Sequence, residues 1–359
     1  MKNISKVAFV IIGTLIGAGF ASGQEIYLFF FSYGMKGFIG ILISSLLMGL
    51  VIYKTLWIVN KYNVATYKDF LDILIPSKSR HPYFNIKYII NLIINTFILV
   101  TFFIMIAGFG AYFEQEFGIN SLIGSTFLAI ATFIIFMTSV KGVVKANEIF
   151  VPILIAFLII MGIINLQEIH FMKLGNYIIQ ANSGNYILSA LLYCSYNSIL
   201  LIPVLLTLKD YIKNQKQIVG ISLTSTLVSI LLSTIVFLLL VRVDVDIAKL
   251  EMPAVYVVSN SFKIFKYVYG FIILASIFTT SISLGTSFLQ NISKNKKSYT
   301  QFAVIMCITS VLTSKIGFSN LINFLYPLFG YLGLLQILKL LITKSFKKLT
   351  KYNFTFTNK

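Results

Sequence analysis

The fold is decided by the stretch Gly13-Thr14-Leu15-Ile16-Gly17-Ala18-Gly19-Phe20-Ala21-Ser22-Gly23-Gln24-Glu25, which lies inside the first long apolar tract, residues 4–33. A glycine in a helix interior costs roughly 1 kcal/mol relative to alanine, and a carboxylate near the middle of a bilayer costs about 2.5 kcal/mol or more. The tract also exceeds the roughly 20 residues that cross a bilayer. We therefore predict that this helix is broken at Gly17, Ala18 and Gly19, and that the exposed backbone lines a cavity.

Parts of this stretch also have a purely structural interpretation. Gly13 and Gly17 have the four-residue spacing that lets two membrane helices pack closely. Ser22 and Glu25 fit a capping box, in which Ser22 caps the second half-helix and Glu25 bonds back to the N–H of the cap residue. Glu25 equally suits direct contact with a substrate or a proton. Both interpretations of Glu25 require a helix to start inside the membrane.

The composition assigns the chain to the multi-span helical membrane proteins. Of its 359 residues, 58% are hydrophobic and 11% are charged, and its mean hydropathy is +0.90; a soluble domain is about a quarter charged. The net charge of +18 comes from short basic clusters between apolar tracts, without a base-stacking motif or zinc spacing, so we expect no nucleic-acid partner. The sequence contains no paired catalytic carboxylates, histidine dyad or metal cluster, so we expect neither an enzyme nor a cofactor.

Ten apolar tracts are long enough to cross a bilayer. With the N-terminus in the cytoplasm, 20 of the 29 basic residues lie on the cytoplasmic side and 7 on the outer side, as expected from the positive-inside rule. We predict an inner-membrane protein with both termini in the cytoplasm, one transporter domain over 1–342 and a basic cytoplasmic tail, 343–359. The tracts are 4–33, 37–60, 84–113, 119–140, 147–166, 185–208, 216–241, 264–292, 299–315 and 318–342.

The tracts divide into two copies of five, residues 4–166 and 185–342. A mixed polar and apolar segment follows the second tract of each copy: a short amphipathic helix at Val64–Leu74, and Val245–Phe262, where we expect an outer lid. Because five is an odd number, the second copy is inverted relative to the first. Inverted repeats of this kind are typical of secondary transporters.

The sixth tract opens the second copy, so it is expected to break as the first does. It contains Tyr193-Cys194-Ser195-Tyr196-Asn197-Ser198, followed by Pro203. Asn197 or Ser198 could cap a second half-helix. The alternative is an unbroken helix whose polar seam is hydrogen-bonded to its neighbours.

Two other tracts carry candidate site residues. Ser276, Thr279 and Thr280 share one face of the eighth tract, and hydroxyl oxygens together with carbonyl oxygens suit a small cation such as Na⁺. The alternative is that these hydroxyls bond back to carbonyls of their own helix. In the third tract, Gly108 could admit substrate beside the first break or simply allow close packing.

The run Gly13–Glu25, with Phe29 to Gly34 after it and LLYCSYNSILLIPVLL in the sixth tract, resembles the YkvI-type bacterial membrane proteins. That family is similar to the amino acid–polyamine–organocation superfamily of LeuT-type transporters. The resemblance covers nearly the whole chain. It implies an all-α membrane protein of ten transmembrane helices in a five-plus-five inverted repeat, with helices 1 and 6 discontinuous.

The resemblance also implies two sites. A Na⁺ site is built in sodium-coupled members from carbonyls before the first break and hydroxyls of helix eight, here Gly13, Ile16, Ser276, Thr279 and Thr280. The substrate site corresponds to Gly17, Ala18, Gly19, Tyr193, Ser195 and Asn197. Glu25 departs from the sodium-coupled pattern, which leaves both Na⁺ and H⁺ open as the coupling ion.

From these features we expect an ion-coupled secondary transporter of a small polar or zwitterionic solute, working by alternating access in the lipid bilayer. The half-helix starts at Ser22 and near Asn197 are expected to face an anionic group of the solute, such as a carboxylate. A ligand-sensing receptor subunit of the spore-germinant permease-like type is the alternative. The sequence leaves the solute, the ion and the oligomeric state open.

Overall fold

The first tract is divided into three helices in the computed structural model, which describes residues 2–64, 67–74, 86–137, 143–166, 184–261 and 263–343. The chain leaves the helical conformation at Ile16 and Gly17, and again at Ser22 and Gly23. The predicted break is therefore confirmed at Gly17, but Ala18 and Gly19 lie in a short helix, and a second interruption follows at Ser22 and Gly23. The three helices are α1 (Lys2–Leu15), α2 (Ala18–Ala21) and α3 (Gln24–Phe29).

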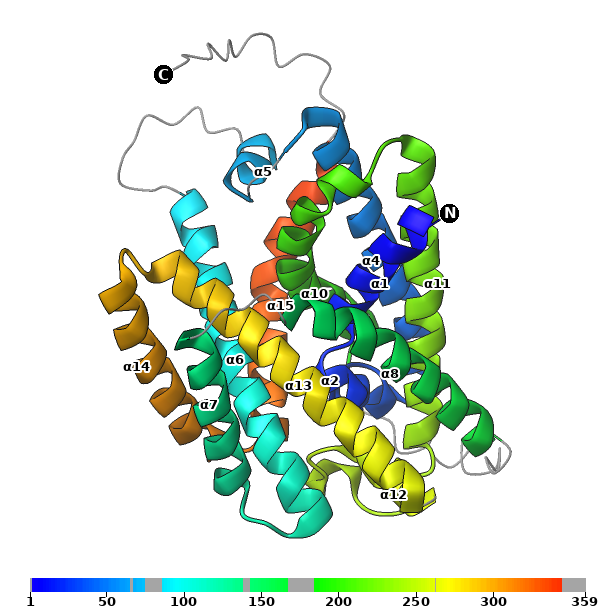
Figure 1. The fold of residues 1–359 in the computed structure, drawn as a ribbon. Helices are drawn as coiled ribbons and strands as arrows, with labels where there is room; N and C mark the ends of the chain where they lie inside the picture. Colours follow the sequence, from blue (N-terminus) through cyan, green and yellow to red (C-terminus); the bar gives the residue numbers. More distant parts are fainter. Residues whose placement is uncertain are drawn as a thin grey trace.

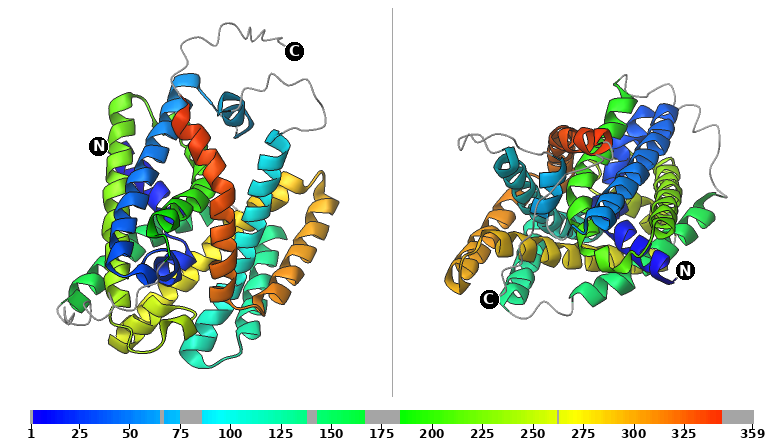
Figure 2. Two further views of the ribbon diagram at one scale, coloured as in Figure 1. Left: turned by 180° about the vertical axis from the view of Figure 1, so that it is seen from behind. Right: turned by 90° about the horizontal axis from the view of Figure 1, so that it is seen from above.

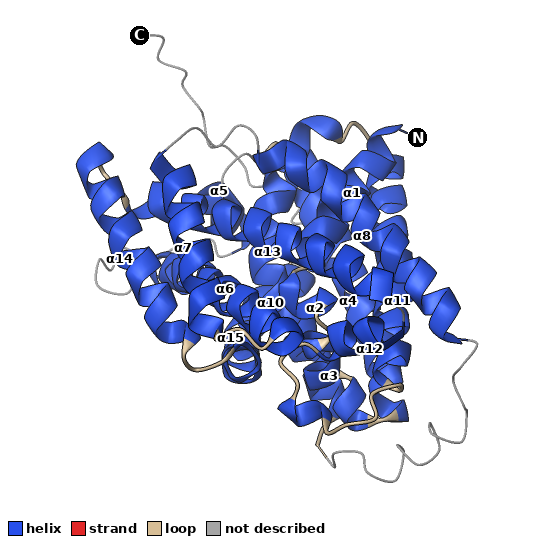
Figure 3. Ribbon diagram, turned by 60° about the horizontal axis from the view of Figure 1, so that its bottom comes forward, coloured by secondary structure: helices blue, strands red, loops and turns tan. Residues whose placement is uncertain are grey.

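The other described elements are also helices, as Figure 3 shows by colour. The long ones are α4 (Met35–Tyr62), α6 (Ile86–Phe117), α7 (Ser121–Met137), α8 (Val143–Leu166), α10 (Tyr186–Thr207), α11 (Gln215–Leu240), α13 (Lys263–Ile292), α14 (Lys296–Ser314) and α15 (Phe318–Ile342). The short ones are α5 (Tyr67–Leu74) and α12 (Pro253–Ser261), with 3-10 turns η1 (Phe31–Tyr33), η3 (Lys209–Tyr211) and η4 (Ile247–Lys249).

Each of the ten predicted tracts coincides with one long helix or, for the first tract, with α1 to α3. Within the described residues, six helices are long and apolar enough to cross a bilayer, namely α4, α6, α10, α11, α13 and α15. The helix α7 and residues Pro152–Ile164 of α8 are shorter apolar helices. The all-α membrane class is confirmed. The number of crossings and the inverted repeat stay predictions, and residues 344–359 of the basic tail lie outside the described part.

The long helices form two groups (Figures 1 and 2). The helices α1, α4 and α11 pack together on one side of the bundle, and α6, α7 and α14 pack together on the other. Between them α10 packs along α15, and α13 contacts both α8 and α14. The start of α1 and α5 lie at one end of the bundle and α12 lies at the other. We call these the amino-terminal end and the α12 end.

The sixth tract does not break, so the predicted discontinuous helix 6 is wrong. The helix α10 is continuous from Tyr186 to Thr207 and is capped by Asn185, not by Asn197 or Ser198. Its polar side chains bond to carbonyls one turn earlier in the same helix: Ser195 to Leu191 at 2.7 Å, Asn197 to Tyr193 at 3.1 Å and Ser198 to Cys194 at 2.6 Å. Unlike the first tract, this helix contains no glycine, so its helical conformation is not weakened in the way that the glycines weaken the first tract.

Glycines of α15 bring its backbone close to α10. A Cβ atom added at Gly333 would lie 2.6 Å from the carbonyl oxygen of Ser195, and one added at Gly330 would lie 2.9 Å from that of Leu192. Both obstacles are backbone atoms, which cannot rotate away. Small residues at a membrane-helix contact allow this close approach, so α15 holds the middle of α10 in place.

Gly333→Ala is expected to destabilise the protein by about 1–3 kcal/mol through overpacking against α10. The measurement is the melting temperature of the purified protein in detergent. Gly17→Ala is the matched control, because nothing lies within 4 Å of a Cβ atom at Gly17. Equal melting temperatures for the two variants would contradict the close contact.

Candidate functional site

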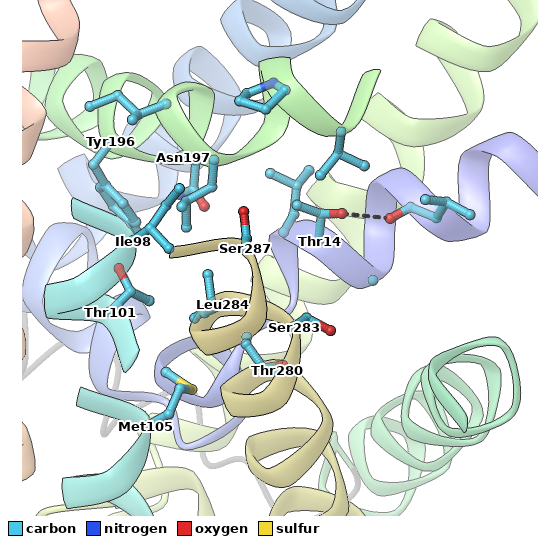
Figure 4. Close-up of a pocket in the computed structure, with 18 of the residues that line it drawn as sticks. Thr14, Ile98, Thr101, Met105, Tyr196, Asn197, Thr280, Ser283, Leu284 and Ser287 are labelled. Atoms are coloured by element: carbon cyan, nitrogen blue, oxygen red, sulfur yellow. Dashed lines mark hydrogen bonds between the residues drawn. The ribbon is translucent and has the colours of Figure 1, made fainter. Parts of the chain in front are cut away.

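A cavity of about 940 Å³ lies beside the first break, among α1, α6, α8, α10, α13 and α15. Its wall is mainly apolar, with a few hydroxyl groups, one amide and one carboxyl group (Figure 4). The polar lining residues are Ser5, Thr14, Glu25, Thr101, Asn197, Thr280, Ser283 and Ser287. The apolar and aromatic ones include Phe9, Ile98, Met105, Tyr196, Leu200, Leu284 and Tyr326.

The cavity extends from the break towards the amino-terminal end. Along α1 its lining runs from Gly17 back to Ser5, and along α13 it runs from Thr280 to Ser287. Along α6 the lining runs from Met105 to Ile98, and along α10 it runs from Tyr196 to Val204, in both cases towards the amino-terminal end. The start of α1, the start of α6 and the last turns of α10 and α13 all lie at that end of the bundle.

The unwound segment at Ile16 and Gly17 forms part of the cavity wall. Gly17 has an extended backbone, with φ −83° and ψ −174°, and precedes α2. A Cβ atom added there would meet nothing within 4 Å, so Gly17 faces open space. Because α1 ends at Leu15, carbonyl groups of its last turn have no N–H partner one turn later. These backbone groups are available to a ligand.

Glu25 is buried, with a side chain that turns back over α2. The hydroxyl group of Tyr196 in α10 donates a hydrogen bond to its carboxylate, and the backbone N–H of Phe20 donates another. Its carboxyl group lies where a side chain at Gly19 would have to be, which explains why glycine occupies that position. Glu25 therefore joins the broken first tract to the unbroken sixth.

The capping box predicted for Ser22 and Glu25 is wrong. The residue that precedes α3 is Gly23, which has a left-handed conformation with φ +84° and provides no side-chain cap. The Ser22 hydroxyl donates to the Gly19 carbonyl at 3.0 Å and accepts from the N–H of Gln24 at 3.3 Å. Glu25 bonds to Tyr196 instead of the N–H of Ser22, because a tyrosine from α10 lies within its reach.

Four aromatic rings contact the ring of Tyr196, namely those of Tyr326, Phe29, Phe97 and Tyr193. Tyr196 stacks on Tyr326 with ring centroids 4.6 Å apart and on Phe29 at 5.4 Å. Phe97 contacts the rings of Tyr196 and Tyr326 edge-on at 6.3 Å. Tyr196 and Tyr326 also line the cavity, and Figure 4 shows Tyr196 projecting from α10 towards Ile98 and Thr101 of α6.

Five of the predicted site residues line this one cavity. They are Gly13, Gly17, Glu25, Asn197 and Thr280, and they come from three separate tracts, the first, the sixth and the eighth. Two of them, Gly13 and Thr280, belong to the predicted Na⁺ site. Of its other members, Thr279 is buried and its hydroxyl bonds back to the carbonyl of Ala275 at 3.0 Å, as the alternative interpretation expects. The Na⁺ site stays a prediction.

The other predicted site residues are not among those that line the cavity. Gly108 packs against the ring of Phe318, which is 2.8 Å from a Cβ atom added there, so its role is close packing. Tyr193 packs edge-on against Phe29 and Phe30. The remaining ones, which do not appear among the lining residues, are Ile16, Ala18, Gly19, Ser22, Ser195 and Ser276.

Hydrogen bonds from distant helices close the α12 end of the break. The N–H of Ala254 in α12 donates to the carbonyl of Ser22 at 2.8 Å, and the Tyr269 hydroxyl in α13 donates to the carbonyl of Ala21. Gln115, near the end of α6, bonds to both the carbonyl and the N–H of Met252, at 3.0 and 2.8 Å. The segment expected to form a lid therefore covers the break at this end.

A partly buried ion pair lies at the same end. The Lys266 ammonium lies 3.4 Å from the Glu116 carboxylate, whose side chain is only 5% exposed, and Glu116 also accepts from Ser259 at 2.6 Å. Glu251 accepts from the N–H of Ser319 at the start of α15, at 2.6 Å. Helices α6, α12, α13 and α15 are thus tied together at the α12 end, and the cavity extends from the break towards the other end.

Several lining residues were absent from the sequence-based site. Tyr196 lies inside the polar cluster quoted from the sixth tract, and Thr14 lies inside the first motif, so proximity to those motifs was an available signal. Thr101 and Tyr326 stand in apolar tracts with no motif around them. Nothing in the sequence separates these two residues from core residues.

Sequence comparison finds two relatives from Bacillus subtilis that match almost end to end. The chain is 31% identical to the uncharacterized membrane protein YkvI over 353 residues, which cover 96% of each chain. It is 25% identical to the uncharacterized protein YyaD over 339 residues, 94% of this chain and 96% of that one. No family model matches the sequence.

Structure comparison finds transporters. MhsT in complex with L-phenylalanine has a TM-score of 0.59 at 16% identity, covering 92% of this chain and 87% of that one. A manganese transporter from Eremococcus coleocola has a TM-score of 0.58 at 14% identity, covering 94% and 78%. At these identities the likeness establishes the fold, which is that of the LeuT-type transporters.

A cysteine in place of Gly17 is expected to react with a membrane-impermeant thiol reagent added from the amino-terminal end, because Gly17 faces the cavity. The measurement is labelling of the embedded protein in a background with Cys194→Ala and Cys307→Ala, from each side of the membrane. Ala18→Cys is the control, since Ala18 is 0% exposed and is expected to stay unlabelled. Faster labelling of Gly17→Cys from the α12 end would contradict the direction of the cavity.

Proposed function

We propose that this chain, which belongs to the family of the Bacillus subtilis membrane protein YkvI, is an ion-coupled secondary transporter of a small solute. The observation that carries the proposal is the cavity beside the broken first tract, closed at the α12 end and extending towards the other. A broken helix at mid-membrane is where transporters of this kind bind solute. The transporter fold supports the same conclusion.

The pattern of helix contacts supports the five-plus-five inverted repeat. The proposed exchange relates α1 to α10, α4 to α11, α6 to α13, α7 to α14 and α8 to α15. If each helix is replaced by its counterpart, one observed contact becomes another observed contact. The contact of α10 with α4 becomes that of α1 with α11, and the contact of α13 with α8 becomes that of α6 with α15. In the same way, α14 with α6 corresponds to α7 with α13, and α11 with α8 corresponds to α15 with α4. Ten crossings in two inverted copies account for these pairs.

The charge distribution supports an orientation with both termini in the cytoplasm of a bacterial inner membrane. In that orientation the cavity extends towards the cytoplasm, and the segment at η4 and α12 closes the outer side. The described conformation then represents the inward-facing half of an alternating-access cycle. Opening of the outer side would require the bonds from Ala254 to Ser22 and from Tyr269 to Ala21 to break.

The solute is proposed to be a small polar molecule such as an amino acid, an amine or a similar compound. One structural neighbour was solved with L-phenylalanine and another is named a manganese transporter. Within the described part of this chain, no group of three or more His, Cys, Asp or Glu residues could hold a metal ion. An organic solute therefore fits the cavity better than a divalent metal ion.

Two residues bear on the coupling ion. Thr280 places a hydroxyl group on the cavity wall with Gly13, which supports a Na⁺ site between α1 and α13. Glu25 supports proton coupling, because a buried carboxyl group can exist with or without its proton at little change in volume. Uptake measured under a Na⁺ gradient and under an H⁺ gradient distinguishes the two ions.

A solute that raises the melting temperature of the purified protein is expected to accumulate in proteoliposomes under a Na⁺ or H⁺ gradient. The first measurement is a thermal-shift screen of amino acids, amines and nucleobases, each with and without Na⁺. The second is uptake of the best compound under each gradient. Binding without accumulation under either gradient would favour the ligand-sensing receptor alternative over transport.

Gly17→Leu is expected to abolish ligand stabilisation and uptake, because a leucine side chain at Gly17 extends into the open space that the cavity provides. Membrane insertion and the melting temperature without ligand are expected to stay near those of the wild type. The matched variant Gly17→Ala should keep at least part of the ligand response. Full ligand stabilisation in Gly17→Leu would show that the solute binds elsewhere.

A further inference from the structure

Glu25 gives the cavity its charge. Among the described residues that line the cavity it is the one acidic residue, and none of those residues is a lysine, arginine or histidine. Its side chain is only 3% exposed, so bulk water does little to screen it. An ionised Glu25 therefore makes this part of the cavity negative, and a bound group of positive charge would be attracted to it.

The hydrogen-bond partners of Glu25 are neutral. The Tyr196 hydroxyl and the Phe20 N–H both donate to the carboxylate, and the two ion pairs found in the described residues, Lys266 with Glu116 and Lys249 with Asp246, lie at the α12 end. A buried carboxylate without a cation is costly, since its removal from water is not offset by an opposite charge. Glu25 is thus suited to bind a cation that enters the cavity.

The position of Glu25 also excludes an acidic solute from the break. Its carboxyl group lies against Gly19 and accepts the N–H of Phe20, so the chain itself fills the place beside α2. A solute carboxylate brought to this place would meet a like charge in a poorly screened setting, which is unfavourable. An ionised Glu25 would therefore disfavour, beside α2, the anionic group that is expected there from the sequence.

The groups around Glu25 are those that recognise an ammonium ion. Tyr196 and Tyr326 line the cavity next to the carboxylate. The ring of Tyr196 stacks on Tyr326 and Phe29, so its hydroxyl oxygen, which can accept as well as donate, is the group that an ammonium N–H would meet. The hydroxyl groups of Thr101 and Thr280 also line the cavity and can accept N–H hydrogen bonds. The rest of the wall, with Phe9, Ile98, Met105, Leu200 and Leu284, is apolar.

We propose that the cavity binds an organic amine with an apolar body and no carboxylate, and that Glu25 pairs with its ammonium group beside Tyr196 and Tyr326. The apolar wall towards the amino-terminal end receives the hydrocarbon part. This inference narrows the solute class of the proposed function, and it rests on that function for the route by which the amine reaches the site.

The test uses compounds that share one phenyl ring and differ in charge. Phenethylamine carries an ammonium group, 2-phenylethanol is neutral, 3-phenylpropionate is an anion and L-phenylalanine is a zwitterion; hexylamine replaces the ring by an aliphatic chain. Binding of each to the full-length protein in nanodiscs is measured by calorimetry. Phenethylamine and hexylamine are expected to bind at least tenfold more tightly than the neutral, anionic and zwitterionic compounds.

Variants then locate the site. Glu25→Gln, which keeps the size of the side chain and removes its charge, is expected to weaken phenethylamine binding at least tenfold and to remove the preference over 2-phenylethanol. The control is Glu114→Gln, the same change at an exposed carboxylate near the α12 end, which should bind as the wild type does. The comparison of compounds on the wild type stands without any variant, should Glu25→Gln fold poorly.

The proposal is overturned if neither amine binds, or if 2-phenylethanol or L-phenylalanine binds as tightly as phenethylamine. It is also overturned if Glu25→Gln folds and keeps the preference for amines. Nanodiscs hold no ion gradient, so these results do not depend on transport. Amine binding without gradient-driven uptake would contradict the transporter alone, whereas uptake of another solute without amine binding would contradict only the amine site.

Discussion

A peptide group that leaves a helix inside a bilayer must find its hydrogen-bond partners within the protein. The first tract leaves the helix twice, and partners for its carbonyl groups come from far along the chain. Ala254 donates to Ser22 and Tyr269 donates to Ala21. The Ser189 hydroxyl in α10 donates to the carbonyl of Phe29 at 2.7 Å. The break thus requires α10, α12 and α13 to lie where they do.

These bonds explain why the two ends of the bundle differ. At the α12 end, α12 and α13 donate hydrogen bonds to carbonyl groups of the broken segment. The ion pair of Glu116 with Lys266 joins α6 to α13 at the same end. At the amino-terminal end, α1 diverges from α13, and side chains such as Ser283 and Ser287 line open space between them. A cavity that is closed at one end only is the geometry that alternating access requires. In the proposed transport cycle, the bonds at the α12 end would be replaced by equivalent bonds at the other end.

Glu25 links this architecture to the chemistry of the solute. Its bond to Tyr196 connects the first tract to α10, which glycines of α15 hold at close range. A movement of the broken segment relative to α10 would therefore change the surroundings of the carboxylate. This coupling between helix position and an ionisable group is how a bound cation can bias one conformation over another. The same residue is at once a structural tie and the source of charge in the cavity.

Local sequence patterns determined which segments are helical and where the first one breaks. The apolar lengths predicted all ten helical tracts, and the glycines of Gly13–Glu25 predicted the interruption at Gly17, because helix length and glycine cost are properties of a short segment. They did not predict the helix at Ala18–Ala21 or the second interruption at Ser22 and Gly23. The sixth tract carried polar residues that looked like a second break, yet α10 stays intact, because its side chains bond within the helix. A polar cluster alone does not distinguish these outcomes.

Only the tertiary structure decided what Glu25 contacts and which polar residues reach the cavity. Tyr196 lies 171 positions from Glu25 along the chain, and Ala254 comes from a different segment again. The sequence therefore determined the broken helix, its membrane setting and its candidate residues. The neutral partners of Glu25, the closed α12 end and the direction of the cavity depend on how distant helices pack, which no local pattern specifies.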